Sequence, residues 1–310
     1  METRRIVSLI VRVIGLSIIH FIIWMAASSI VAGALGITVP LEMQSSMVNA
    51  MALMLATCFC NTAVLCYAIF RSCFRKWKLV LTVFLLYFGI NTFLSQIETI
   101  YFNASLNIPA TEIISFFLIG LITAVVFSPL AVLILGKFKK AASPAHAPQV
   151  HAKSKGDLII RIAVIAVVVY PVLYFSFGYF VLWQFSEARV FYSGTAQKLP
   201  FFTHMASLLK GDPWIYPWQV LRGLIWAGIA LPVIRMSTAK WTETGVLVGL
   251  LFAILMNAVH ILPNPYMPQV IRMAHLLETA TSNFILGFVT VYLLLRCGRR
   301  AERRKGRGDR

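Results

Sequence analysis

Charged residues are scarce in this sequence, and acidic residues are the scarcest of them. Asp, Glu, Lys and Arg make up 13% of the 310 residues, whereas soluble globular domains carry about 25%. The chain has 11 Asp and Glu against 28 Lys and Arg, and its mean hydropathy is +0.80. A composition so poor in charge and so rich in apolar residues excludes a soluble globular protein.

Several chemical signatures are also absent. The sequence has no Gly-rich phosphate loop, no His-Glu-x-x-His, no Gly-x-Ser-x-Gly, and no two neighbouring carboxylates of the kind found in intramembrane prenyl-protease-like enzymes. It also has no Cys-x-x-Cys pair among its five cysteines, none of which falls in a predicted outer loop. We therefore expect no extracytoplasmic disulfide, and the chemistry has to be sought elsewhere.

The apolar residues form eight continuous runs of helical length. A bilayer requires about 20 apolar residues for each helical span, and each run is close to that length. The sequence thus predicts an all-α, polytopic transmembrane bundle of about eight helices. The runs cover residues 6–34, 47–69, 79–97, 111–135, 158–182, 215–234, 244–261 and 270–295.

The basic residues that give the net charge of +17 are distributed unevenly between the two sides of the predicted membrane. Most of the Lys and Arg residues lie beside the first span, in the loops after spans two, four and six, or after the end of span eight. In an eight-span path, all these segments lie on the same side of the membrane. The positive-inside bias places both termini on the cytoplasmic side of the membrane. We expect that membrane to be a bacterial inner membrane or an equivalent one. We expect the basic loops and tail to contact anionic lipid headgroups and not nucleic acid.

Three motifs recur in the same order in both halves of the chain. Arg71-x4-Lys76-Trp77, followed by Asn91, matches Arg235-x4-Lys240-Trp241 with Asn257. Arg12 in Val-Arg-Val matches Arg161 in Ile-Arg-Ile, and the segment 115–120 matches 282–287, each beginning with Ser and ending with Gly. Such order predicts a duplication with parallel repeats. The predicted parts are a first four-span repeat (1–140), an Ala/Pro-rich cytoplasmic linker (141–156), a second repeat (157–298) and a basic tail (299–310).

Polar residues inside the spans form stripes on the third and fourth span of each half. An ionised side chain at the bilayer centre costs about 2.5–3.5 kcal/mol on insertion scales, so the positions of such residues are informative. Helical spacing places several of them on shared faces in the outer half of the bilayer. The predicted binding residues are Glu98, Glu112, His260, His275, Glu278, Arg272, Arg222, Asn91 and Asn257.

This constellation allows several kinds of chemistry. His275-x-x-Glu278 has the spacing of metal ligands in helical bundles, and with His260 it could bind zinc or iron. The same groups could instead transfer protons, while Arg272 and Arg222 could bind an anion or pair with carboxylates. Alternatively, residues near the span ends are solvated by headgroup water, and His260 only makes a hydrogen bond to a neighbouring helix. For His20, deep in the first span, the sequence favours an interhelical hydrogen bond over a role as a ligand.

The leading functional interpretation is a carrier for a small solute or ion, with or without coupling to protons. The alternatives are an intramembrane metal-dependent enzyme acting on a lipid-borne substrate, and a non-catalytic assembly or sensor subunit. A carrier requires a polar cavity with two exits, and an enzyme of this kind requires three or four ligands around one metal ion. A non-catalytic subunit requires neither.

The distribution of cations makes a direct prediction about topology. On a background without cysteine, Thr195→Cys should react with a membrane-impermeant thiol reagent added from outside, because residues 184–213 form the long outer loop. Ser143→Cys, in the predicted cytoplasmic linker, should react only after the membrane is opened. The reverse labelling pattern would contradict the topology and the placement of the polar residues in the outer half.

Overall fold

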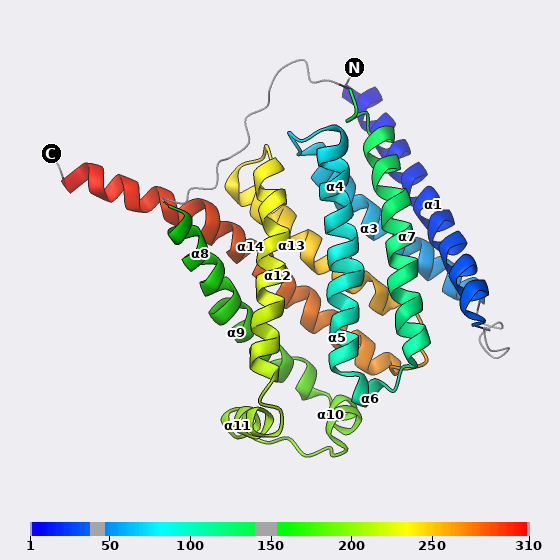
Figure 1. The fold of residues 1–310 in the computed structure, drawn as a ribbon, viewed down its shortest axis with the longest axis vertical. Coiled ribbons are helices and arrows are strands. Elements are labelled where there is room, and N and C mark those ends of the chain that lie inside the picture. Colours follow the sequence, from blue (N-terminus) through cyan, green and yellow to red (C-terminus); the bar gives the residue numbers. More distant parts are fainter. Residues whose placement is uncertain (1, 38–46, 140–153, 309–310) are drawn as a thin grey trace. The chain divides into compact units, whose positions relative to one another are not determined.

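The computed structural model describes residues 2–37, 47–139 and 154–308, and the long regular elements in these ranges are all helices (Figure 1). Eight of these helices are long and apolar enough to cross a membrane, as the sequence predicts. They are Val7–Leu35, Asn49–Phe70, Lys76–Tyr101, Ala110–Ile134, Lys155–Gln184, Ile215–Met236, Trp241–Ile261 and Gln269–Leu295. Most of the predicted linker lies outside the described residues. The protein is therefore all-helical and compatible with a polytopic membrane protein.

The chain divides into two compact units. The first consists of Met1–Pro144 together with Ile254–Arg272, and the second of Ala145–Ala253 together with Met273–Arg310. The division passes close to the predicted linker, but the end of the seventh span and the start of the eighth group with the first unit. Hydrogen bonds from Asn91 to the Leu255 carbonyl and from Thr57 to the Ala258 carbonyl hold this segment there.

Four long helical segments form the first unit. α1 packs against α7 and α3, while α4 and the π-helix η1 pack against α7 (Figure 1). The elements, in chain order, are α1 (Glu2–Leu35), α3 (Met47–Phe70), α4 (Lys76–Leu86), η1 (Tyr87–Leu94), α5 (Ser95–Tyr101), α6 (Asn103–Leu106) and α7 (Ala110–Ile134), with the 3-10 helix η4 (Ala258–Ile261) added from the later part of the chain.

His20 is the buried polar centre of the first unit. Its Nδ1 lies 3.0 Å from Thr62 Oγ1 on α3, and its Nε2 lies 2.8 Å from Tyr87 Oη on η1. The imidazole also stacks on Phe127 of α7, with ring centroids 4.4 Å apart. One side chain of α1 thus contacts the three other long segments. His20 makes the interhelical hydrogen bonds that the sequence favoured over a role as a ligand.

Lys137 caps the end of α3. Its ammonium group donates hydrogen bonds to the carbonyl oxygens of Phe70, at 3.3 Å, and Ser72, at 3.0 Å. A cation at this position also complements the negative end of the helix dipole. Burial lowers the pKa of the Lys137 amine from its ordinary value, and the nearby Arg75 guanidinium lowers it further. This basic residue therefore contributes to structure as well as to net charge.

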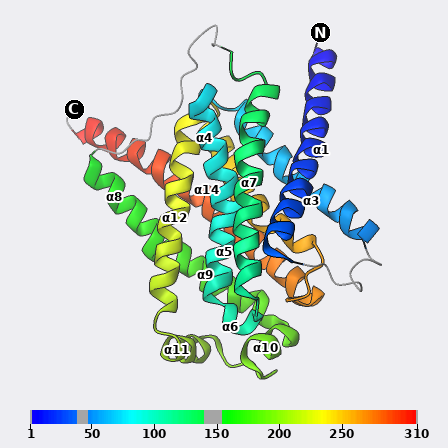
Figure 2. The same cartoon turned by 45° about the vertical axis from the view of Figure 1, so that its right-hand side comes forward.

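The second unit is built around α12, which packs against η2 and α9. Figure 2 shows the short helix α11 lying across the end of α12. This helix lies within residues 184–213, the segment for which the sequence predicts a long outer loop. The elements are α8 (Lys155–Val164), the π-helix η2 (Ile165–Val169), α9 (Tyr170–Phe180), η3 (Leu182–Gln184), α10 (Ser186–Ser193), α11 (Phe201–Gly211), α12 (Ile215–Met236), α13 (Trp241–Asn257) and α14 (Gln269–Gly308).

α13 and α14 approach each other closely at glycines. A Cβ atom added to Gly287 of α14 would lie 2.7 Å from the backbone of Gly249 on α13. Gly245, one turn before Gly249, leaves room in the same way for the Phe288 ring. A small residue at every fourth position lets helix backbones meet directly, which is a common mode of packing in membranes.

The motif positions that match between the two halves make similar contacts within each unit. Arg12 donates to the carbonyl of Ile134 on α7, and Arg161 donates to the carbonyl of Leu293 on α14. Gly120, the counterpart of Gly287, also lies where an added Cβ would collide, in this case with Thr92 of η1. These parallels agree with the predicted duplication. The two-repeat arrangement itself stays a prediction.

The glycine contact between α13 and α14 can be tested by substitution. Gly287→Ala is expected to destabilise the protein by about 1–3 kcal/mol, because the added methyl group meets backbone atoms that cannot rotate away. The matched control is Gly228→Ala on α12, where an added Cβ meets no atom within 4 Å. Thermal unfolding in detergent should show a lower midpoint for the first variant only. Equal midpoints would contradict the close approach.

Candidate functional site

His275 and Glu278 form a hydrogen-bonded pair on α14. The i, i+3 spacing brings the side chains together, with His275 Nδ1 3.0 Å from Glu278 Oε2. The Glu278 side chain is only 6% exposed, and that of His275 is 19% exposed. The sequence predicted both residues as members of one site, and the structure brings these two into direct contact.

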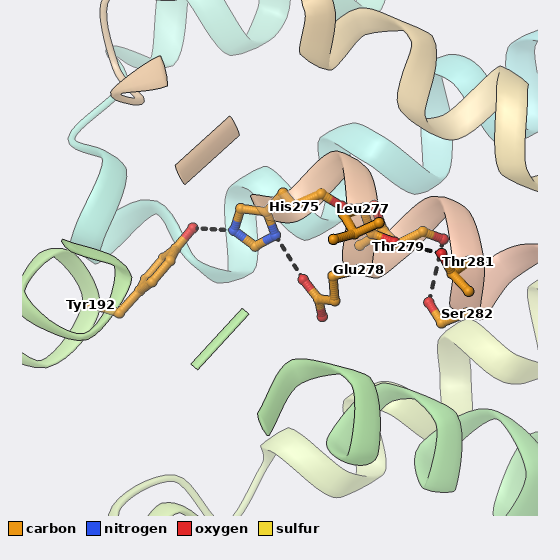
Figure 3. Close-up of polar contacts among 7 residues, drawn as sticks. All are labelled: Tyr192, His275, Leu277, Glu278, Thr279, Thr281 and Ser282. Carbon is orange, nitrogen blue, oxygen red and sulfur yellow. Dashed lines mark hydrogen bonds and ion pairs between the residues drawn. The ribbon is translucent and has the colours of Figure 1, made fainter. Parts of the chain in front are cut away.

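Tyr192 of α10 extends this pair into a chain of three residues. Its hydroxyl oxygen lies 2.8 Å from His275 Nε2, and the two rings meet edge to face at 5.8 Å (Figure 3). Both ring nitrogens of His275 are therefore engaged, one by a phenol and one by a carboxyl group. Tyr192, which the sequence argument did not single out, completes the site.

The chemistry of the partners fixes the positions of the protons. An ionised carboxylate can only accept, so Nδ1 carries a proton when Glu278 is ionised. In the neutral imidazole, Nε2 then accepts the hydrogen bond from the Tyr192 hydroxyl. Protons can move along this chain by short hops at both nitrogens. The arrangement is thus suited to proton transfer between Tyr192 and the buried Glu278.

Arg189 holds the segment that presents Tyr192. This buried guanidinium donates to the carbonyl oxygens of Ala196 and Trp183, both at 2.7 Å, and to that of Gln184 at 3.1 Å. α10 also packs through Ala188 against Leu182 and Ala274. Tyr192 is consequently held against α14 by a loop that is fixed at both ends of α10.

A glycine on α9 lies beside the Glu278 carboxyl group. A Cβ atom added to Gly178 would lie 3.6 Å from Glu278 Oε1, which is ordinary van der Waals distance. The carboxyl group is therefore confined between α9 and its own helix. The hydrogen bond from His275 provides this buried carboxyl group with a polar partner.

Arg222 lies in the second unit, in a different environment from Glu278. It is buried on α12, where its Nη1 donates to Gln219 Oε1 at 3.1 Å. The guanidinium carbon also lies 5.6 Å from the centre of the Tyr170 ring, within the range of a cation–π interaction. Arg222 thus has the packed, partnered setting expected of an arginine inside a span.

Asn91 and Asn257, the two matched asparagines, both lie where a helix departs from α geometry. Asn91 is inside the π-helix η1, and its side chain donates to the Leu255 carbonyl at 2.9 Å. Asn257 is the last residue of α13, and the 3-10 helix η4, which contains His260, follows it. The convergence of Glu98 and His260 with His275 and Glu278 stays a prediction.

The remaining predicted residues lie at helix ends in the first unit. Glu112 is in the first turn of α7 and interacts with Tyr266, whose pKa is raised to about 12 by burial and by this hydrogen bond and charge. Arg272 donates a hydrogen bond to the Leu262 carbonyl. Glu98 is half-buried in the first turn of α5. The contacts of Glu112 and Arg272 order the loop between spans seven and eight.

The described residues contain no cluster of metal ligands that would support the metal interpretation. Among the side chains that the structure describes, in residues 7–37, 49–139 and 154–295, no group of three or more His, Cys, Asp and Glu could hold a metal ion. His275 and Glu278 are adjacent, but the predicted set of His260, His275 and Glu278 does not form such a group. His275 has Tyr192 and Glu278 as neighbours instead.

A sequence signal for α10 and Tyr192 does exist. Glu187 lies in the first turn of the helix, and Gly194 follows its last residue with a positive φ of 70°. An acidic first turn and a terminal glycine together mark a short helix. The register of Tyr192 against His275 could not follow from these signals, because it depends on how the loop folds back.

No family model matches the sequence, and comparison with curated proteins and with solved structures finds no similar protein. The functional argument therefore depends on the residues of this chain alone.

Proposed function

We propose that the protein is a proton-coupled carrier for a small solute or ion in a bacterial inner membrane or an equivalent one, with both termini in the cytoplasm. The hydrogen-bonded chain Tyr192–His275–Glu278 is the observation that supports it most. Tyr192 belongs to the predicted outer loop, whereas Glu278 lies about two and a half turns from the start of the span Gln269–Leu295. Together these residues lead from the outer surface to a carboxyl group inside the bilayer.

Proton uptake would proceed by two linked transfers. His275 receives the hydroxyl proton of Tyr192 at Nε2 and gives its Nδ1 proton to Glu278 Oε2, after which water returns a proton to the phenolate. The products are neutral Glu278, neutral His275 and neutral Tyr192, so the net result is one proton moved from the outer water to the carboxyl group. The relay is reversible and requires no cofactor.

Protonation changes the cost of burying Glu278. An ionised side chain in a span is destabilised by several kcal/mol relative to its neutral form. A conformation in which the site is closed to water is therefore favoured when Glu278 is protonated, and an open conformation is favoured when it is ionised. That difference is the coupling free energy which a proton-driven carrier requires.

Transport by reconstituted protein tests the proposal. Proteoliposomes containing a pH-sensitive dye are given gradients of sodium, potassium, amino acids or carboxylates in turn, and proton movement is recorded. We expect at least one gradient to drive protons, and Glu278→Gln to reduce that rate by about a hundredfold, because proton-transfer groups contribute factors of this size. Tyr192→Phe should slow the flux and retain part of it.

Glu187→Gln serves as the matched control, since this carboxyl group is exposed at the start of α10 and accepts a hydrogen bond from the Ser186 hydroxyl. It should transport at nearly the wild-type rate. Undiminished proton flux in Glu278→Gln would contradict the proposal, as would the absence of proton movement under every gradient.

A further inference from the structure

A second polar site lies in the first unit, where α3, η1 and the end of α13 meet. Two of these three segments depart from α geometry, since residues Tyr87–Leu94 form a π-helix and Ala258–Ile261 form a 3-10 helix. Such irregular segments release carbonyl oxygens from the regular helical pattern. They occur frequently at functional sites in α-helices, and broken spans commonly bind ions in carriers.

Side chains from the two other segments reach the carbonyls at the end of α13. Asn91 Nδ2 donates to Leu255 O at 2.9 Å. Thr57 Oγ1 lies 3.2 Å from Ala258 O and 3.0 Å from Leu53 O of its own helix. The single hydroxyl proton of Thr57 is therefore shared between two carbonyls, and each carbonyl oxygen keeps a lone pair for a further partner.

Asn61 contributes an acceptor with no hydrogen bond. Its side chain is 2% exposed, and Oδ1 has no partner among the described residues. A buried unpaired acceptor costs about 1–3 kcal/mol, and native structures contain few of them. No contact within the described residues satisfies this oxygen.

Helical geometry places Asn61 on the face that carries Thr57. The two residues are four apart on α3, so their side chains share a face one turn, about 6 Å, apart. Leu255 precedes Ala258 by three residues, also about one turn. The second and seventh spans run in opposite directions in the predicted topology. Moving one turn forward along α3, from Thr57 to Asn61, therefore corresponds to moving about one turn backward along the seventh span, from Ala258 to Leu255. Asn61 thus lies at the level of the carbonyl that Asn91 contacts.

The acceptor groups of this junction are all neutral oxygens. The junction offers an amide oxygen, a hydroxyl and two backbone carbonyls, and one N–H of the Asn91 amide is already engaged by Leu255. Hard cations prefer oxygen ligands, and divalent ions usually add carboxylates to the set. Rings of neutral carbonyl oxygens instead suit monovalent ions.

We propose that Asn61, Thr57 and the carbonyl oxygens of Leu255 and Ala258 bind a monovalent alkali cation. The cation would be the ion that the proposed carrier exchanges for protons, so its role depends on the proposed function although its binding does not. The unpaired Asn61 oxygen becomes a ligand in the occupied site. A bound cation would also link α3 to the irregular end of α13, because its ligands come from both segments.

The test measures binding in the purified full-length protein. Thermal midpoints are recorded against increasing LiCl, NaCl or KCl, with N-methyl-D-glucamine chloride holding the ionic strength constant. A ligand that binds only the folded state raises the midpoint saturably. We expect one alkali cation to do so, and Asn61→Leu to raise its apparent Kd by at least about tenfold, since one oxygen ligand is lost.

A pair of threonines supplies the matched control. Thr57 and Thr123 are both buried, and each hydroxyl bonds to a carbonyl four residues earlier, but only Thr57 also reaches another span. Thr57→Val should weaken the cation response, whereas Thr123→Val should retain it. This pair also decides the matter if Asn61→Leu does not fold.

The outcomes separate this inference from the proposed function. No cation-specific rise in the wild-type midpoint, or an unchanged response in both Asn61→Leu and Thr57→Val, would overturn the cation site. Glu278→Gln should bind the cation normally and lose proton flux. Proton flux driven by another solute, with no cation binding, would overturn the cation site and leave the proton-coupled carrier standing. Cation binding without any proton flux would support the cation site and overturn the proton-coupled carrier.

Discussion

A polar group inside a bilayer has no water to bond with, and this constraint governs the placement of polar side chains in both units. Each such group requires a protein partner or a ligand, because an unsatisfied one costs several kcal/mol in hydrocarbon. His20 meets the requirement with Thr62 and Tyr87, and Arg222 meets it with Gln219 and the Tyr170 ring. These contacts connect helices and give each unit a specific core.

The two proposed sites differ from these interhelical contacts. Glu278 is a buried carboxyl group whose hydrogen bonds lead outward through His275 to Tyr192, and not to another helix of the core. Asn61 is a buried amide whose oxygen has no partner among the described residues. In the proposals made above, one site carries a proton and the other binds a cation. A carrier that exchanges the two requires both, and the fold places one in each unit.

Much of the fold follows from the sequence, because continuous apolar runs and stripes at helical spacing are local features. The eight spans and the His275–Glu278 pair both follow from the spacing of residues along the chain. Tyr192 and Asn61 were missed because their roles depend on contacts between distant segments. The π-helix at Asn91 was missed too, since no residue pattern marks an extra residue in a helical turn.

The central claim is that Glu278 gains and loses the transported proton in exchange for a cation. Infrared difference spectroscopy of the protein in lipid bilayers, with and without the alkali cation, observes the carbonyl stretch of a protonated carboxyl group directly. The account predicts that adding the cation removes such a band, and that Glu278→Gln abolishes the change. A spectrum without this band, or the same change in Glu278→Gln, would contradict the account.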